Sequence, residues 1–488
     1  MTNLLRSAVI ALLVASAAAA PVQPGLSEMT HLSGIDGTEQ PYGLYIPESH
    51  DPDGEPLPLV ILLHGLGATW ETYWNYLPVE EWAEEESFVV ATPHGRGDWY
   101  YVGPGETDVL EVIEEVQRLC HVDPDRIYLI GHSMGGWGVW QLGVSHPDLF
   151  AAIIPTASWA PLDLLPNLRH TPLVFLHGRD DTVVQVEYAR EIDAELSRLG
   201  IEHSYLEAPA WGHHSALVAH MLPVFGRWLQ QQRRPATPPA ELSIRTYTPR
   251  RGSSHWLRML ETIEFPDLAS IDASFEAEDS RLRITTDNVA AFAVDLSALP
   301  GWAGESLTLW VDGPLPSVTL SAPLDTLSFE REGDSWSIDA GLSVEQFIPA
   351  EPVIAHLDEP LDHPITELCG ILAEETGSDT GVIRDVYACP GLDAGDVTAD
   401  EVLDLYLRPQ DELYLVEMPA STLAVVTSGE RNVTFPELPL DDPDRLFTVA
   451  MGDYQMRRLP EEVESVEPQG VRVIEVIFDH IAETGELP

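Results

Sequence analysis

An apolar run that ends at a small-residue turn around one serine constrains this chain more than any other stretch. Residues 127–136 read Ile-Tyr-Leu-Ile-Gly-His-Ser-Met-Gly-Gly, and a helix-like segment follows. The glycines at positions 131 and 135, two before and two after Ser133, leave room for a sharp turn in close contact with neighbouring backbone. The pattern predicts a buried strand, a tight turn that exposes the Ser133 hydroxyl and a helix, which is typical of a nucleophilic serine.

Strand-like and helix-like segments alternate on both sides of this turn. An opening hairpin is predicted at 31–33 and 42–46, and buried strands are predicted at 57–63, 88–91, 126–130, 150–155, 172–176 and 203–206. Helices are predicted around 74–82 and at 109–119, 137–143, 186–199 and 216–232. Because such alternation builds parallel β-α units, residues 29–232 are expected to form an α/β domain with a mainly parallel sheet.

The periodicity changes after residue 232. Residues 233–240 are rich in arginine and proline and are interpreted as a linker, since proline prevents the helix from continuing. A period of two over 241–345 predicts a small all-β accessory domain. Residues 346–488 mix both patterns, with helices expected at 365–375, 399–406 and 471–481, and are interpreted as an α+β domain. A length of 488 residues fits several domains.

The charge balance is strongly acidic. The chain has 80 acidic residues against 25 basic ones, a net charge of −55, and every basic residue is arginine. Such a surface repels phosphate backbones, so nucleic acid is not expected as a partner. Dense carboxylates are tolerable where salt screens their repulsion, which predicts a high-salt habitat.

The N-terminus is typical of an export signal. Arg6 precedes an apolar run over residues 8–20, and we expect residues 1–20 to be a signal peptide cleaved within 17–20. The run is short for a membrane anchor, so the mature protein is expected to be secreted or periplasmic without a stable span. Three cysteines are too few for a disulfide framework. Cys369 and Cys389 could pair in an exported domain, and Cys120 is interpreted as a buried structural thiol.

The remaining parts of an acyl-transfer site can be proposed in the expected chain order. Asp180 and Asp181 follow a predicted strand and compete for the role of the acid, and His213 and His214 compete for the role of the base. The backbone N–H groups of Met134 and Leu66 are candidates for stabilising an oxyanion, because both follow the carboxyl ends of predicted parallel strands. The residues alone leave both pairs open. Their order along the chain is serine, acid, histidine.

Residues 29–232 resemble α/β-hydrolases of the esterase group that includes polyhydroxybutyrate-depolymerase-like, feruloyl-esterase-like and so-called predicted-peptidase proteins. The resemblance rests on His-Gly-Leu-Gly at 64–67, on Asp-Arg-Ile-Tyr at 125–128 leading into the serine turn, on His177-Gly178 with Asp181, and on Gly212-His213. In that group the acid lies four positions after the histidine of the His-Gly pair and the base follows the glycine. The resemblance therefore implies Asp181 as the acid and His213 as the base, with His64 and His177 bracing loops and His132 in the pocket wall.

Aromatic residues near the predicted strand ends are candidates for the substrate-binding wall. They suit sugar rings, aryl esters or polyester chains, although tryptophan is also commonly buried for packing; these candidates are Trp70, Trp74, Trp99 and Trp137. No cofactor or metal motif competes with this interpretation. The adjacent His213 and His214 cannot easily share one metal, and no His-Glu-x-x-His pattern occurs.

A second resemblance concerns the C-terminal region. The segments 364–368, 381–384, 394–398 and 447–454 are similar to the C-terminal domain of bacterial 5′-nucleotidases. In that family the domain binds the nucleoside, while a separate metal domain, absent here, hydrolyses the phosphate. The Asn-Gly-Gly run expected before Arg384 is replaced, so the region is interpreted as a recruited binding or structural module.

Three functions are compatible with the residues. The first is an exported serine hydrolase that cleaves a small-molecule or polymeric carboxylic ester through an acyl-enzyme on Ser133. The second is a serine peptidase related to prolyl oligopeptidases, which share the catalytic arrangement but normally carry a propeller domain for which we expect no room before Met29. The third is a binding protein with a vestigial hydrolase domain. The sequence leaves the oligomeric state and the acyl group open.

Overall fold

The computed structural model describes residues 23–302 without interruption. Beyond them it describes 306–313, 318–319, 326–333, 335–340, 353–357, 365–376, 378, 380–384, 395–398, 412–419, 423, 432–435, 446–452, 465–473, 476–477 and 480. The predicted signal peptide, the expected helix at 399–406 and Cys389 lie outside these ranges, so the predictions made for them stay predictions.

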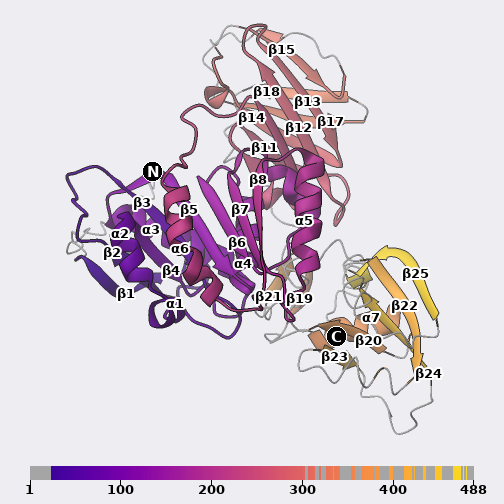
Figure 1. The fold of residues 1–488 in the computed structure, drawn as a ribbon. Coiled ribbons are helices and arrows are strands. Elements are labelled where there is room, and N and C mark those ends of the chain that lie inside the picture. Colours follow the sequence, from indigo (N-terminus) through magenta and orange to yellow (C-terminus); the bar gives the residue numbers. More distant parts are fainter. Residues whose placement is uncertain are drawn as a thin grey trace, which may run out of the picture.

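An eight-stranded mixed sheet organises residues 25–232 (Figure 1). Its strands are β1 (Gly25–Leu32), β2 (Glu39–Ile46), β3 (Leu57–Leu63), β4 (Val89–Pro93), β5 (Val122–His132), β6 (Ala152–Thr156), β7 (Leu173–Gly178) and β8 (His203–Ala208). They lie side by side in the order β1-β2-β4-β3-β5-β6-β7-β8. The pairs β1·β2 and β2·β4 are antiparallel, and every pair from β4 to β8 is parallel. The predicted opening hairpin and parallel core are therefore both present.

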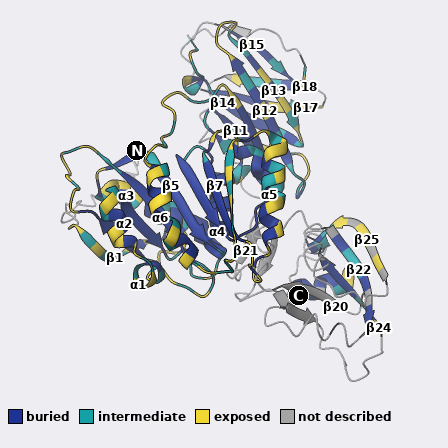
Figure 2. Cartoon of the chain, in the orientation of Figure 1, coloured by how far each residue is buried: buried dark blue, intermediate teal, exposed yellow. Residues whose placement is uncertain are grey.

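Helices cover both faces of this sheet. Helices α3 (Pro104–Leu119), α4 (Met134–Ser145) and α5 (Val186–Leu199) contribute to one apolar cluster, and α2 (Val79–Glu86) and α6 (Ala216–Leu229) contribute to another. The central strands β3, β4, β6 and β7 are buried between these layers, whereas the edge strands β1 and β8 are partly exposed (Figure 2). Every residue of α4 is buried, as expected for a helix without a polar face. Cys120, which follows α3, is 5% exposed, so its prediction as a buried thiol is confirmed.

The sequence predicted one helix around residues 74–82, but the structure has two helices there. Helix α1 (Thr72–Tyr76) ends at Leu77, whose φ of −121° and ψ of 151° are extended. Helix α2 begins directly after Pro78. A residue that precedes proline is disfavoured in the helical region, which accounts for the break at Leu77. The sequence analysis also missed a 3-10 helix, η1 (Leu162–His170).

Two five-stranded sheets follow the irregular residues 233–240 (Figure 1). One has the order β10-β11-β14-β17-β18 and the other β16-β15-β13-β12-β9, and side chains from both sheets form one apolar cluster. The strands are β9 (Glu241–Thr246), β10 (Ser253–Ser254), β11 (Leu257–Thr262), β12 (Ala269–Glu276), β13 (Arg281–Asp287), β14 (Val289–Asp295), β15 (Ser306–Val311), β16 (Val318–Thr319), β17 (Thr326–Glu332) and β18 (Ser335–Ala340). Strands β10, β11, β16 and β18 were not anticipated.

The β-rich region is joined to residues 25–232, called the hydrolase region after the resemblance noted above, by specific contacts. The Asn167 amide of η1 donates to the carbonyl oxygen of Arg245 at 2.9 Å and accepts from its backbone N–H at 2.7 Å. Elsewhere the buried carboxylate of Glu106 on α3 accepts hydrogen bonds from Arg251 at 2.8 and 3.0 Å and lies 2.7 Å from His146 Nε2. These contacts fix β9 and its neighbouring turn against η1 and α3.

The described C-terminal residues form a five-stranded sheet and a short two-stranded one. The larger sheet has the order β23-β20-β24-β22-β25, and the smaller pairs β19 with β21. The elements are β19 (Val353–Leu357), α7 (Ile365–Thr376), β20 (Thr380–Arg384), β21 (Gly395–Thr398), β22 (Glu412–Pro419), β23 (Asn432–Phe435), β24 (Leu446–Gly452) and β25 (Ser465–Arg472). Helix α7 confirms the helix predicted at 365–375. The closing helix expected from 471 was placed too early, because β25 runs through Arg472 and the described positions from Val473 onward are helical.

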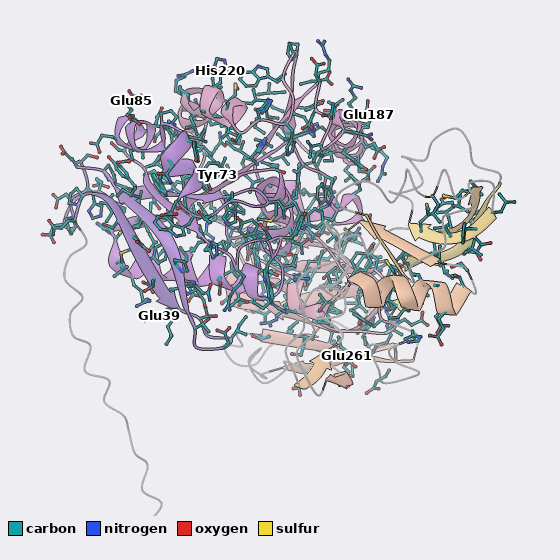
Figure 3. The ribbon with its side chains drawn as sticks, turned by 90° about the horizontal axis from the view of Figure 1, so that it is seen from below. Glu39, Tyr73, Glu85, Glu187, His220 and Glu261 are labelled. Carbon is teal, nitrogen blue, oxygen red and sulfur yellow. The ribbon has the colours of Figure 1, made fainter. Side chains whose placement is uncertain are left out.

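Three labelled glutamates illustrate the exposed acidic side chains of the molecule. Figure 3 shows Glu39, Glu85 and Glu187 at its outer edge, and all three are exposed, whereas the labelled Tyr73 is buried. Within the described residues, no helix is both long and apolar enough to cross a membrane.

Candidate active site

Ser133 lies at the junction of β5 and α4. The strand ends at His132, the helix begins at Met134, and Ser133 between them has a φ of 59° and a ψ of −120°. A residue other than glycine rarely adopts this conformation, and it costs on the order of 1–3 kcal/mol. The strained turn predicted from the sequence is therefore present.

The glycines around Ser133 are required by neighbouring backbone. A Cβ added at Gly131 would lie 2.2 Å from the carbonyl oxygen of Gly135, and one added at Gly135 would lie 2.0 Å from that of Leu63. A Cβ at Gly136 would lie 2.4 Å from the carbonyl oxygen of Thr156. These distances are well below van der Waals contact, so the turn packs against β3 and β6 only because three side chains are missing.

His213 is the histidine that contacts the serine. Its Nε2 lies 2.8 Å from Ser133 Oγ, and the two residues are 80 positions apart in the chain. His213 follows β8 in a loop at the carboxyl end of the parallel strands. The neighbouring His214 is exposed. Of the two candidates for the base, the structure brings His213 to the serine.

Asp181 holds the other side of the His213 ring. Its Oδ2 lies 2.7 Å from His213 Nδ1, and its Oδ1 accepts hydrogen bonds from the backbone N–H groups of Val183 at 2.8 Å and Val184 at 2.9 Å. Asp180 instead has a side chain that is 58% exposed and lies 3.6 Å from Arg179. The structure therefore brings Asp181, and not Asp180, into contact with the histidine.

The Asp181 carboxylate is stabilised in its charged form. Burial opposes ionisation, but hydrogen bonds from His177 and His213 outweigh it and hold the pKa of Asp181 below its ordinary value. His177 Nε2 also lies 2.8 Å from the carbonyl oxygen of Val184. His177 thus braces the acid loop, as the resemblance implied. A charged Asp181 is what an imidazolium at His213 requires.

His132 packs against the base. The two imidazole rings have centroids 5.0 Å apart, and His132 Nδ1 lies 3.0 Å from Thr156 Oγ1. Burial, aided by the neighbouring charge of His213, lowers the pKa of His132 to about 3. A neutral His132 therefore lies beside His213, so it adds no positive charge that would oppose protonation of the base.

Hydrogen bonds fix the loop that carries Leu66. His64 contacts the carbonyl oxygens of Gly65 at 3.0 Å and His94 at 2.9 Å, and the Gly67 N–H donates to Asp98 Oδ1 at 2.7 Å. A Cβ added at Gly65 would lie 3.6 Å from Ser133 Cβ, so this loop passes directly beside the serine. The structure thus brings the loop of Leu66 and the first residue of α4, Met134, to the two sides of Ser133.

Two tyrosines brace the same loop, and sequence reasoning missed this role. The Tyr73 hydroxyl donates to the carbonyl oxygen of Leu63 at 2.8 Å, and the Tyr101 hydroxyl donates to that of His64 at 3.1 Å. Both side chains are buried. Residue spacing and composition do not predict these contacts. The tyrosines lie on α1 and in the segment before α3, whereas their acceptors lie at the end of β3.

The four candidate tryptophans do not form one wall. Both Trp70 and Trp74 pack on Gly43 of β2, where a Cβ would lie 2.9 Å from Trp70 Cε3 and 2.5 Å from Trp74 Nε1. Strands β4 and β3 lie between β2 and the serine strand. The Trp74 N–H also donates to Thr92 Oγ1 at 2.7 Å. Trp70 and Trp74 therefore pack on the sheet, and their expected role in binding substrate stays a prediction.

The other two tryptophans follow strand ends near the serine. Trp137, four positions after Ser133 on α4, is 2% exposed and stacks on Trp159 with ring centroids 5.4 Å apart. Trp159 in turn lies 6.3 Å from Tyr100. Trp99 is half-buried in the segment after β4. Trp137, Trp159 and Tyr100 therefore form a buried aromatic cluster, which includes a residue one helical turn after Ser133, and Trp159 was not anticipated.

One group of metal-ligand residues occurs among the described residues, and it is not at this site. It consists of His31, Asp108 and Glu111, which come from β1 and α3. Strands β2, β4 and β3 separate β1 from the serine strand. The geometry at Ser133 can support proton transfer and nucleophilic attack through side chains and backbone N–H groups alone.

Comparisons with known proteins show what part of this chain is similar to. The model of the prolyl oligopeptidase family matches residues 74–163. The bifunctional acetylxylan esterase/xylanase XynS20E of Neocallimastix patriciarum is 27% identical over 153 residues, which cover 30% of this chain and 22% of that protein. Feruloyl esterase B of Thermothelomyces thermophilus is 27% identical over 147 residues, which cover 28% of this chain and 49% of that protein.

Among solved structures, the fluorophosphonate-binding serine hydrolase FphF of Staphylococcus aureus matches with 20% identity and a TM-score of 0.38, covering 42% of this chain and 99% of that one. The chain spans no more than half the length of the two curated relatives above. The family model lies within the hydrolase region, so the C-terminal resemblance to nucleotidases stays a prediction. The mixed sheet fits the α/β-hydrolase fold, and the hydrolase region is similar to esterases and serine hydrolases.

Proposed function

We propose that this protein is an exported serine hydrolase that cleaves carboxylic esters through an acyl-enzyme on Ser133. The observation that carries the proposal is the continuous contact from Ser133 Oγ to His213 Nε2 at 2.8 Å and from His213 Nδ1 to Asp181 Oδ2 at 2.7 Å. Nucleophile, base and orienting acid are thus in hydrogen-bond reach of one another, as acyl transfer by serine requires.

The reaction follows from the positions of these groups. His213 Nε2 takes the Ser133 proton as Oγ attacks the ester carbonyl, and the negative Asp181 stabilises the resulting imidazolium. The N–H groups of Met134 and Leu66 stabilise the oxyanion. His213 then gives its proton to the departing alcohol, which leaves the acyl group on Ser133. Water, activated by the same histidine, attacks the acyl-enzyme and releases the acid.

A substrate with an aryl or sugar ring is part of the proposal. Trp99 after β4 is half-buried and has ring surface left for a flat or weakly polar group, whereas Trp137, Trp159 and Tyr100 are buried in the core. The names of the two curated relatives, an acetylxylan esterase/xylanase and a feruloyl esterase, support the same class. We therefore favour acetyl or aryl esters attached to sugars over long-chain acyl esters.

Export and a salt-rich habitat are part of the proposal. Residues 1–20 support export through their single positive charge and apolar run. The net charge of −55, with no lysine in the chain, supports function in concentrated salt. Detection of an intact Met1 on the exported protein would contradict cleavage of a signal peptide.

A peptidase is the alternative, and the match to the prolyl oligopeptidase family is the observation that favours it. A panel of p-nitrophenyl acetate, p-nitrophenyl butyrate and methyl ferulate, assayed beside p-nitroanilide amides in concentrated NaCl, separates the two. Turnover of esters without amides supports the proposal, and turnover of amides without esters supports the peptidase. If neither esters nor amides are turned over, and Ser133→Ala cannot be distinguished from the parent chain, the result supports a binding protein with a vestigial hydrolase.

A further inference from the structure

A cluster of potential metal ligands, two of them buried and one partly exposed, joins the first strand to a helix of the hydrolase region. His31 on β1 and Asp108 and Glu111 on α3 each offer one ligand atom, and these atoms all lie within 4.8 Å of one another. His31 is 4% exposed and Asp108 is 1% exposed. The spacing of three positions puts Asp108 and Glu111 on one face of α3, which is the face that meets β1.

Two buried atoms in this cluster lack hydrogen-bond partners. His31 Nδ1 and Glu111 Oε2 are both shielded from solvent and neither makes a hydrogen bond. They point toward each other at a distance of 3.4 Å. A buried polar atom without a partner is costly, and each one requires a physical reason. An ion between the two atoms would supply that reason.

The distance between the two atoms fits shared coordination. A tetrahedral zinc-class ion binds nitrogen and oxygen ligands at about 2.1 Å, so two of its ligand atoms lie roughly 3.4 Å apart. The observed separation of His31 Nδ1 and Glu111 Oε2 is 3.4 Å. A direct hydrogen bond between the same two atoms would be shorter, at about 2.7–2.9 Å.

Neighbouring groups orient the two carboxylates. The second oxygen of Glu111, Oε1, accepts a hydrogen bond from the Gly34 N–H at 2.8 Å. Asp108 is held by Arg96, whose Nε lies 2.7 Å from Oδ2 and whose Nη2 lies 3.3 Å from Oδ1. Each carboxylate oxygen has a second lone pair, so these contacts leave room for a metal bond. Outer partners of this kind fix the orientation of metal ligands.

The charge of the cluster favours a cation. Asp36 and Asp108 both contact the guanidinium of Arg96, at 2.6 and 2.7 Å, and Glu111 belongs to the same ligand cluster as Asp108. When ionised, these three carboxylates carry two more negative charges than the one guanidinium balances. A divalent cation would neutralise them, whereas burial of uncompensated charge is expensive.

We propose that His31, Asp108 and Glu111 bind a zinc-class divalent cation that ties β1 to α3. One imidazole nitrogen and two carboxylate oxygens suit Zn²⁺, Mn²⁺ or Co²⁺, whereas Ca²⁺ prefers oxygen ligands only. The site is structural, because β2, β4 and β3 separate it from the serine strand. It is independent of the proposed esterase activity.

Cobalt is the probe that tests this site. The full chain is treated with a chelator, dialysed into about 1 M NaCl so that exposed carboxylates are screened, and titrated with CoCl₂ while the visible absorption of Co²⁺ is recorded. We expect one Co²⁺ per chain with the bands of a low-coordinate site. We also expect His31→Gln and Glu111→Gln each to weaken binding by at least about 100-fold, since loss of an outer partner alone costs 10–100-fold.

His203→Gln is the matched control. His203 Nε2 lies 3.0 Å from Asp193 Oδ1 and is likewise half of a histidine–carboxylate pair, but it belongs to no such cluster among the described residues. This variant should bind Co²⁺ as the parent chain does. Added Zn²⁺ should raise the Tm of the parent chain and of His203→Gln, but not the Tm of His31→Gln. Circular dichroism establishes that each variant is folded. Absence of stoichiometric binding by the parent chain, or binding unchanged by His31→Gln, would overturn the proposal.

Discussion

Asp181 contacts His213 directly, because its Oδ2 accepts a hydrogen bond from Nδ1 of that histidine at 2.7 Å. The adjacent Asp180 faces solvent. This single contact distinguishes two adjacent aspartates that the residues alone leave equivalent. It also gives the carboxylate a defined task, which is to orient the ring and to stabilise its protonated form.

The two aspartates should differ sharply when each is neutralised. We expect Asp181→Asn to lower kcat/KM for a p-nitrophenyl ester by on the order of 10⁴, because the amide favours the wrong tautomer of His213. Asp180→Asn, the matched control, should change kcat/KM by less than about two-fold, since surface substitutions away from special features have small effects. Equal losses in both variants would contradict the assignment of the acid.

The buried His132 should make stability dependent on pH. Burial, aided by the neighbouring charge of His213, lowers its pKa to about 3 in the folded chain from 6.5. The unfolded chain therefore binds a proton that the folded chain does not, so this contribution is complete above pH 6.5 and is lost as the pH falls toward 3. The slope is about 1.4 kcal/mol per pH unit within that window.

Urea unfolding of the parent chain and of His132→Asn at pH 7.5, 6 and 5 measures this effect. Asparagine cannot take up the proton, so the free energy of unfolding of the variant should fall less steeply than that of the parent. Parallel curves over this range would show that His132 does not titrate between the folded and unfolded states as inferred.

Gly135 should not tolerate a methyl group. A Cβ at this position would lie 2.0 Å from the carbonyl oxygen of Leu63, which belongs to the central strand β3 and cannot move freely. We expect Gly135→Ala to destabilise the chain by about 3 kcal/mol or more and to displace Ser133. Gly313→Ala is the control, because no atom lies within 4 Å of the added Cβ there. A normal Tm and normal esterase activity for Gly135→Ala would contradict the packing described for the turn.

The Glu106 carboxylate should contribute to the attachment of the β-rich region. It is 2% exposed and contacts both Arg251 and His146. Burial opposes its ionisation, but Arg251 and His146 outweigh this and lower the pKa of Glu106 below its usual range. We expect Glu106→Gln to cost roughly 3–5 kcal/mol at pH 7, because it removes the buried carboxylate that the Arg251 guanidinium contacts.

The sign of the pH effect follows from that direction. A lowered pKa in the folded state means that the contribution is present above about pH 4.5 and is lost as the pH falls below it. The difference in unfolding free energy between the parent chain and Glu106→Gln should therefore shrink as the pH is lowered from 5 to 3. Limited proteolysis near residues 233–240 reports whether the two regions separate, and unchanged cleavage would argue against an attachment role.

Salt should stabilise the whole chain. A net charge of −55 repels itself, and screening shortens from about 10 Å at 0.1 M to about 3 Å at 1 M ionic strength. We expect the Tm to rise steadily from 0.1 to 2 M NaCl, and a part of this rise to occur with KCl as well. Maximal stability in dilute buffer would contradict the salt-rich habitat.

Local patterns predicted the parts of the fold that local chemistry determines. The turn at Ser133 was recognisable because glycine spacing, an apolar strand and a buried helix all lie within about twenty residues. The parallel sheet followed from the alternation of strands and helices. The break before Pro78 was missed because the apolar spacing of Trp74, Leu77 and Trp82 is continuous across it.

The contacts between residues distant in the chain could not be predicted from the sequence. Asp180 and Asp181 are equivalent in a pattern, and only the path of the loop after β7 decides which one is buried. Trp70 and Trp74 follow the loop of Leu66 in the chain, yet they turn back onto Gly43 of β2. His31 lies 77 to 80 positions from its partners on α3, so no spacing motif could reveal that cluster.

Covalent labelling with a fluorophosphonate tests the central claim most directly. The parent chain, Ser133→Ala and the control Ser158→Ala are incubated with the probe in about 2 M NaCl, digested and analysed by mass spectrometry. We predict that the parent chain and Ser158→Ala carry one probe on the peptide that contains position 133, and that Ser133→Ala, folded by circular dichroism, carries none. Labelling that persists in Ser133→Ala, or a folded parent chain that does not react, would contradict the account.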